Sequence, residues 1–168
     1  DGRPSWPTAA STACRSDSDE RVRSRIVWHT RTVLILLRHG RTAANEQGLL
    51  QGRRDQDLDD HGEQQALDAA AHFTDLVGRV DSVIASPLKR AQQPAGAFEL
   101  PVETDERFIE LAYGIYEGVP HADVPSEVWN RWRDDRSFVP EGGESLAALD
   151  ERVRGALDSL VERAEDEN

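Results

Sequence analysis

The residues with the clearest chemical potential form a short run, Arg38-His39-Gly40, which directly follows an apolar stretch. A histidine can act as a nucleophile, glycine allows close approach to the backbone, and arginine presents a planar fork of donors that matches phosphate oxygens. The tripeptide alone is weak evidence, because a histidine that caps a solvated loop would have the same sequence. Its position is more informative, since open α/β sheets bind ligands at the carboxyl ends of their strands.

A second arginine, Arg90, follows a second candidate strand. Ser86-Pro87 predicts the start of a helix, with serine as N-cap and proline at the first helical position, which places Arg90 on the first turn. A helix N-terminus carries positive dipole character and favours anions. A solvated arginine on a helix surface is the simpler interpretation of Arg90 taken alone. Two arginines and a helix start at neighbouring strand ends nevertheless predict a pocket for an anion.

Three strands are predicted to position these side chains. The apolar run Val33 to Leu37 is short and partly β-branched, which indicates a buried central strand of a parallel sheet. Val80 to Ala85 predicts a second strand, and Pro101 to Thr104 a short third one. Helices are expected over 62–77, from Ser86, around Val128, Trp129 and Trp132, and from about Ser145, with one helical turn in a loop over 41–60. This alternation predicts an α/β three-layer sandwich, with a mostly parallel central sheet and helices on both faces.

Composition and charge limit the classes of partner. The 168 residues suit one domain, and the longest apolar run has five residues, far short of a membrane span. Residues 33–168 hold 14 basic and 28 acidic side chains, a net charge of −14. Such a surface repels nucleic acid and anionic membranes, so neither is expected as a partner. It also repels a phosphate ester at long range, so a phosphate site must concentrate its arginines locally.

Residues 1–31 are predicted to be a disordered leader, because they are rich in Ser, Thr, Ala, Arg and Asp and lack apolar periodicity. The single cysteine, Cys14, lies there and cannot form a disulfide within the chain. The chain contains no Met, which favours a fragment or a processed product. A cytoplasmic location fits these observations.

Several spaced motifs, taken together and in order, resemble those of the histidine phosphatase superfamily, also called phosphoglycerate-mutase-like. The resemblance runs from Val33 to the chain end, and residues 32–168 are expected to be the histidine phosphatase domain. The motifs are Leu-Leu-Arg-His-Gly-Arg-Thr-Ala-Ala-Asn (36–45), Gln51-Gly52 followed by Asp55, Leu58 and Gly62, Ser-Pro-Leu-Lys-Arg-Ala (86–91), Glu-Arg-Phe-Ile-Glu (106–110), Gly-Ile-Tyr-Glu-Gly (114–118) and Pro-Glu-Gly-Gly-Glu-Ser (140–145). Such a series is far more specific than any one motif.

The resemblance implies a role for each matching residue. His39 would attack phosphorus and carry the phosphoryl group, while Arg38, Arg90 and Asn45 would bind its oxygens. Glu110 would protonate the leaving oxygen and then activate water. Gln51, Gly52 and Ser145 are weaker candidates for substrate binding. No metal or other cofactor is expected, because donors and cations around the phosphate can stabilise the transferred group.

The sequence departs from the family pattern at two places. Such domains continue past the last helix into a further strand with a second active-site histidine, whereas this chain ends at Asn168. The expectation is therefore a domain that is incomplete at its C-terminus, without the last strand and second histidine, and so a weak or inactive enzyme. The other departure is Pro94, where the family usually has Thr, and it is expected to kink or end its helix.

The resemblance implies a phosphomonoester hydrolase that acts on a small phosphorylated metabolite, such as a sugar phosphate, a phosphoglycerate or a cobalamin-precursor phosphate. A phosphoglycerate-type mutase is the first alternative, although mutases carry insertions that grip their substrate and the route from Glu110 to Ser145 is short. A non-catalytic phosphate-binding module is the second, because the second histidine is absent. A homodimer is one option for assembly.

Overall fold

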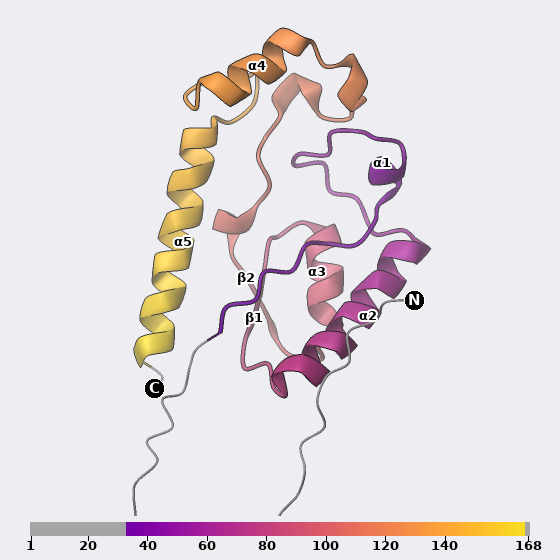
Figure 1. The fold of residues 1–168 in the computed structure, drawn as a ribbon, viewed down its shortest axis with the longest axis vertical. Helices are drawn as coiled ribbons and strands as arrows, with labels where there is room; N and C mark the ends of the chain where they lie inside the picture. The colour runs from indigo at the N-terminus through magenta and orange to yellow at the C-terminus, as the bar shows by residue number, and fades with distance from the viewer. Residues whose placement is uncertain (1–32, 167–168) are drawn as a thin grey trace, which may run out of the picture. The chain divides into compact units, whose positions relative to one another are not determined.

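The computed structural model describes residues 33–166, so the predicted leader, with Cys14, lies outside the described residues. Figure 1 shows the elements in chain order. They are α1 (Ala43–Glu46), α2 (Asp60–Val77), β1 (Val83–Ala85), α3 (Lys89–Gly96), β2 (Val102–Thr104), the 3₁₀ helices η1 (Glu106–Phe108), η2 (Gly114–Tyr116) and η3 (His121–Asp123), α4 (Ser126–Asp134) and α5 (Leu146–Asp166). None of these described helices is long and apolar enough to cross a membrane.

Strands β1 and β2 form a parallel pair, with Val83 opposite Val102 and Ala85 opposite Thr104. Helix α3 connects them and packs against both, and α2 packs on α3. Helix α5 lies on the other side of the strand pair from α2 and α3 (Figure 1). This layering confirms the α/β class with a parallel sheet between helices. The carboxyl end of β1 leads to Arg90, and that of β2 leads through η1 to Glu110.

The prediction of a buried strand over Val33 to Leu37 is wrong for this structure. The run forms no strand, and Val33, Leu34, Leu36 and Leu37 are 68%, 55%, 78% and 39% exposed. The sheet of the described residues contains only β1 and β2, which pair with each other. A strand is stabilised by ladder hydrogen bonds to neighbours, so strand propensity without a paired neighbour leaves the segment extended but irregular.

Helix α2 confirms the predicted helix and begins two residues earlier, at Asp60. Asp59 caps it, because its Oδ1 accepts from Gly62 N at 2.8 Å and its carbonyl accepts from Glu63 N at 2.9 Å. Gly78 follows the helix with a φ of +77°, a conformation that favours glycine, and the helix ends at Val77, the end of the predicted range.

Helix α3 begins later than its sequence predicts. Its N-cap is Leu88 rather than Ser86, and Leu88 offers no side-chain acceptor. The acceptor comes instead from Asp55, whose Oδ1 receives Lys89 N at 2.7 Å. Arg90 still lies on the first turn, as predicted. Pro94 is accommodated inside the helix, which ends two residues later at Gly96.

An aromatic core holds the segment between Glu110 and α5. Trp132 of α4 is buried at its centre, with ring contacts to Tyr113 at 5.4 Å and to Tyr116 and Phe138 at 5.9 Å. Leu50 and Val124 complete the buried cluster. The core therefore anchors the loop after Glu110 to α4, and the helix expected around Val128, Trp129 and Trp132 is confirmed.

Candidate active site

The loop that carries His39 is fixed to the start of α2 through two glycines. A side chain at Gly40 would overlap the carbonyl of Gly62, and a side chain at Gly62 would overlap the backbone of Arg41. Hydrogen bonds secure this close approach: Asp59 N donates to Arg41 O at 3.0 Å, and Arg41 N donates to Gln65 Oε1 at 2.9 Å. The Arg41 side chain also pairs with Asp59, at 2.8 Å. The helix thus determines where the His39 loop lies.

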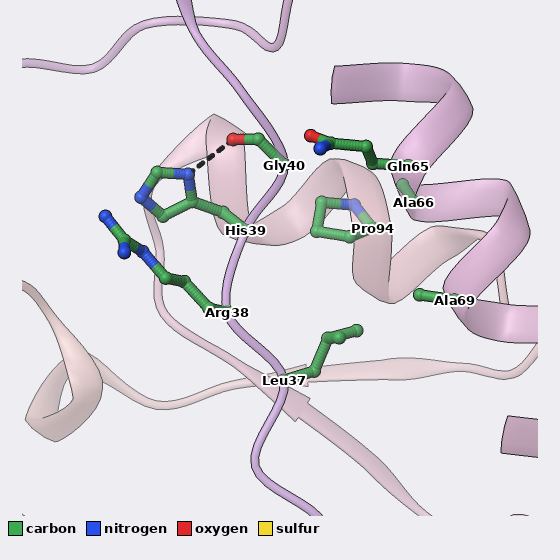
Figure 2. Close-up of a pocket in the computed structure, with 8 residues that line it drawn as sticks. All are labelled: Leu37, Arg38, His39, Gly40, Gln65, Ala66, Ala69 and Pro94. Carbon is green, nitrogen blue, oxygen red and sulfur yellow. Dashed lines mark hydrogen bonds between the residues drawn. The ribbon is translucent and has the colours of Figure 1, made fainter. Parts of the chain in front are cut away.

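The imidazole of His39 is held in one tautomer. Its Nδ1 lies 2.7 Å from the carbonyl oxygen of Gly40, and a carbonyl can only accept, so Nδ1 carries the proton (Figure 2). Nε2 therefore presents a lone pair. Burial lowers the pKa of His39, and the positive charges of Arg90 and Arg38 lower it further, against the opposing effects of the Gly40 hydrogen bond and the Glu110 charge. These effects favour the neutral imidazole, while a nucleophilic role for His39 stays a prediction.

Arg90 is a buried cation with uncharged partners. It is 2% exposed, and its Nη1 and Nη2 donate to the carbonyl oxygens of Arg54 at 2.8 Å and Gly52 at 2.7 Å. Burial lowers its pKa, while Glu110, Asp55 and Glu117 raise it from a distance. A buried charge is costly unless it is paired, so the site favours the arrival of an anion.

The turn at Gln51 and Gly52 supports other site residues. Gly52 has a φ of +53°, and a side chain there would overlap the Glu117 carboxylate, which accepts from Arg53 N at 3.0 Å. The Gly52 carbonyl thereby points at Arg90. Gln51 is buried, and its Oε1 accepts from the Thr42 hydroxyl at 3.0 Å. These contacts orient the Arg90 side chain and the turn at Thr42, whereas contact of Gln51 or Gly52 with substrate stays a prediction.

Asn45 lies in α1 and forms a capping box with Thr42. Its Oδ1 accepts from Thr42 N at 3.1 Å, while Asn45 N donates to the Thr42 hydroxyl at 3.2 Å. The oxygen of the amide is thus used within the loop. The amide nitrogen of Asn45, Nδ2, can donate a hydrogen bond to a ligand, as the predicted phosphate-binding role requires.

Glu110 follows η1 and has an exposed side chain. Its Oε1 accepts from Leu111 N at 2.8 Å. Its charge acts on His39 and Arg90. Burial raises the pKa of Tyr113, and the Glu110 charge raises it further. The structure therefore brings His39, Arg38, Arg90 and Glu110 into electrostatic contact. Ser145 caps α5, where its Oγ accepts from Ala148 N at 3.1 Å, and its contact with substrate stays a prediction.

A cavity of about 210 Å³ adjoins His39 (Figure 2). Arg38, His39 and Gly40 form one wall, and side chains of α2 and α3, including Ala66 and Pro94, form the other. A second cleft, of about 570 Å³, is lined by Arg53, Ile115, Glu117 and Glu141 among others. Within residues 33–166, no cluster of His, Cys, Asp or Glu could hold a metal ion.

Three charged residues close to Glu110 were missed from the sequence. Arg53, Glu144 and Arg152 form a network in which Arg53 and Glu144 bind each other across 91 residues of the chain and Glu144 binds Arg152 across 8. Only Glu144 lies within a recognised motif, and neither spacing nor periodicity relates it to the two arginines. Contacts of this kind become visible only in the folded chain.

The chain matches the family model described as histidine phosphatase superfamily (branch 1) over residues 34–168. It is 33% identical over 140 residues to a glucosyl-3-phosphoglycerate phosphatase of Mycolicibacterium vanbaalenii, covering 79% of this chain and 61% of that protein. It is 35% identical over 138 residues to phosphoserine phosphatase 1 of Hydrogenobacter thermophilus, covering 77% of this chain and 64% of that protein.

A solved structure of a mycobacterial glucosyl-3-phosphoglycerate phosphatase in complex with VO3 superposes with a TM-score of 0.66 at 30% identity, covering 73% of this chain and 64% of that one. The chain spans between 38% and 64% of the length of the curated relatives that it matches. The match over most of this chain agrees with the geometry of the His39 loop and the buried arginine. The chain therefore belongs to branch 1 of the histidine phosphatase superfamily.

Proposed function

We propose that this chain carries catalytic machinery of a phosphomonoester hydrolase that works through a phosphohistidine at His39. One observation carries the proposal: a neutral imidazole with its Nδ1 bound to Gly40 O stands beside Arg90, a buried cation whose hydrogen bonds go to carbonyl oxygens. A free Nε2 lone pair next to an unneutralised guanidinium suits attack on a phosphate.

The reaction has two steps. In the first, Nε2 of His39 bonds to phosphorus as the bond to the leaving oxygen breaks, and Glu110 gives that oxygen a proton. Arg38, Arg90 and the Asn45 amide hold the phosphoryl oxygens. In the second, Glu110 takes a proton from water, the water oxygen bonds to phosphorus, and the N–P bond breaks. Inorganic phosphate leaves and the neutral imidazole is restored.

A small phosphorylated metabolite is the proposed substrate class. The relatives named above are phosphatases of glucosyl-3-phosphoglycerate and of phosphoserine, both of them small phosphomonoesters. The acidic surface supports this choice, because the net charge of −12 disfavours polyanionic partners such as nucleic acid. We propose the cytoplasm as its location, since the single Cys14 permits no disulfide within the chain.

The test is turnover of 4-nitrophenyl phosphate by the full chain and by His39→Ala. We expect activity to fall below about 1% of the unsubstituted protein, because a covalent catalyst loses several orders of magnitude without its nucleophile. His72→Ala, at an exposed histidine of α2, is the matched control and should keep full activity. Binding of orthovanadate without any turnover would instead identify a non-catalytic phosphate-binding module.

A further inference from the structure

The backbone of Glu110 is held from two directions. Its carbonyl oxygen accepts from Arg53 Nε at 3.2 Å and from Arg152 Nη2 at 3.3 Å. Arg53 belongs to the turn after Gly52, whereas Arg152 belongs to α5. Two guanidiniums from distant parts of the chain therefore converge on one peptide group.

Glu144 joins these two arginines. Its carboxylate binds Arg152 through two hydrogen bonds of 2.8 Å, and its Oε2 lies 3.1 Å from Arg53 Nη2. The Glu144 and Arg152 side chains are 13% and 17% exposed. The hydrogen bond from Arg152 is the main cause of the lowered pKa of Glu144, so the carboxylate stays ionised. A bidentate pair between a guanidinium and a carboxylate, with both side chains largely buried, has a more defined geometry than an ion pair at the surface.

The same network extends to η1 and to the loop that follows Glu110. Arg152 Nη1 donates to Arg107 O at 2.7 Å, and Glu144 N donates to Ala112 O at 2.9 Å. The segment from Arg107 to Ala112 is thus tied on both sides of Glu110. By contrast, the Glu110 carboxylate is exposed, and its one hydrogen bond within the described residues goes to the adjacent Leu111 N.

We propose that Glu144, Arg152 and Arg53 are positioning residues for Glu110. They fix its backbone so that an otherwise loosely held carboxylate meets the leaving oxygen at His39. A proton donor must lie within hydrogen-bond reach of its acceptor, so a small displacement of the backbone lowers proton transfer. The inference rests on the proposed function, in which Glu110 is the general acid.

A positioning role and a merely structural role differ in their dependence on the leaving group. An activated phenolate leaves without a proton, whereas an alkoxide requires one. Loss of the network should therefore slow an alkyl phosphate far more than an aryl phosphate. A general loss of folded protein would slow both equally.

The experiment compares Arg152→Gln and Glu144→Gln with Arg154→Gln, using 4-nitrophenyl phosphate and glycerol 3-phosphate. Arg154 lies on the same helix, is exposed, and pairs with the half-buried Asp150 away from Glu110, which makes it a matched control. In the first two variants, kcat/KM for the alkyl substrate should fall by about tenfold or more relative to the aryl substrate, because general acid catalysis contributes about 10²–10⁴-fold. The control should leave this ratio unchanged. Arg152→Lys keeps the charge but loses the fork, and should behave as Arg152→Gln.

Amide hydrogen exchange over residues 106–112 gives a second readout that does not require turnover. Exchange should quicken in Arg152→Gln and Glu144→Gln but not in Arg154→Gln. If Arg152→Gln and Glu144→Gln were active but kept the parent's ratio of alkyl to aryl kcat/KM, or kept its exchange rates, the positioning role would be wrong. The proposed function would then still stand. If the unsubstituted protein hydrolysed neither substrate, the proposed function would fail and the positioning role with it, whatever the exchange showed.

Discussion

His39 combines two features that are usually in conflict. A hydrogen bond from Nδ1 to the Gly40 carbonyl supports the charged form, yet burial and two neighbouring guanidiniums favour the neutral form and prevail. The result is a fixed tautomer with a lone pair on Nε2. Arg90 supplies a positive charge. Its hydrogen bonds to two carbonyl oxygens orient the guanidinium, but they do not neutralise it. In the reaction that we propose, these two residues supply the nucleophile and part of the positive charge, and Glu110 supplies the proton.

The titration of His39 tests this electrostatic balance. Because its pKa is lowered below the usual 6.5, the imidazole should stay neutral as the pH falls through 6.5 and gain its proton only in more acidic solution. Since the unfolded chain would bind that proton first, His39 should also lower folding stability as the pH falls through this window. Replacing Arg38 with Gln removes one positive charge and should raise the pKa of His39. NMR titration of the imidazole measures its pKa in the parent protein and in Arg38→Gln. A pKa at or above 6.5 in the parent, or no rise in Arg38→Gln, would contradict this account.

At the level of single elements, the loop between residues 33 and 40 depends on its contact with α2. Its apolar half forms no strand and is largely exposed, while Gly40 packs directly on Gly62. The position of His39 is therefore set by a glycine–glycine contact and the Asp59 cap. Among residues 33–166, no strand pairs with this segment.

The exposure of Leu36 can be tested, because the sequence predicts a buried strand at this position and the structure places an exposed side chain there. Leu36 is 78% exposed, so Leu36→Ala should change the free energy of unfolding by about 0.5 kcal/mol or less. Leu50, which is 4% exposed, is the matched control, and Leu50→Ala should cost about 2–5 kcal/mol. Equal losses in urea unfolding would show that residues 33–37 are buried after all.

Two glycines that lie within helices, Gly62 and Gly155, should respond in opposite directions to substitution by alanine. Gly62→Ala should destabilise the protein by about 1–3 kcal/mol and reduce turnover, because the new methyl overlaps the Arg41 backbone and displaces the His39 loop. Gly155 of α5 has open space around it, so Gly155→Ala should stabilise the helix by about 0.5–1 kcal/mol. Thermal unfolding of both variants checks the signs. A Gly62→Ala protein as stable and active as the parent would rule out a close approach at this point.

Across the whole molecule, the sequence predicted best those features that depend on neighbouring residues. The order of helices and strands, the helix over 62–77 and the first-turn position of Arg90 follow from local periodicity and punctuation. The strand over 33–37 failed because pairing depends on partners elsewhere in the chain. The prediction of Ser86 as N-cap was wrong because Asp55, in another loop, supplies the acceptor for the backbone N–H of Lys89. Arg53 and Arg152 were missed because they reach Glu110 across 57 and 42 residues.

The charge of the whole chain should affect the capture of substrate. With a net charge of −12, the protein repels a dianionic phosphate ester until it reaches the local field of Arg38 and Arg90. Raising the ionic strength to about 0.1 M shortens the screening length to about 10 Å, so kcat/KM should rise with salt. Phosphocholine, whose leaving group is cationic, should show a smaller rise. A kcat/KM that falls steadily with salt would mean that the site arginines dominate at long range.

The most direct measurement is acid-free quenching of the protein during turnover, followed by mass spectrometry of its peptides. Glu110→Gln should be used alongside the parent, because slower activation of water lets a phosphoenzyme accumulate. Our account predicts a phosphoryl group on the peptide that contains His39, formed at least as fast as phosphate is released and absent from His39→Ala. Steady release of phosphate with His39 never labelled, or with the label on another residue, would contradict it.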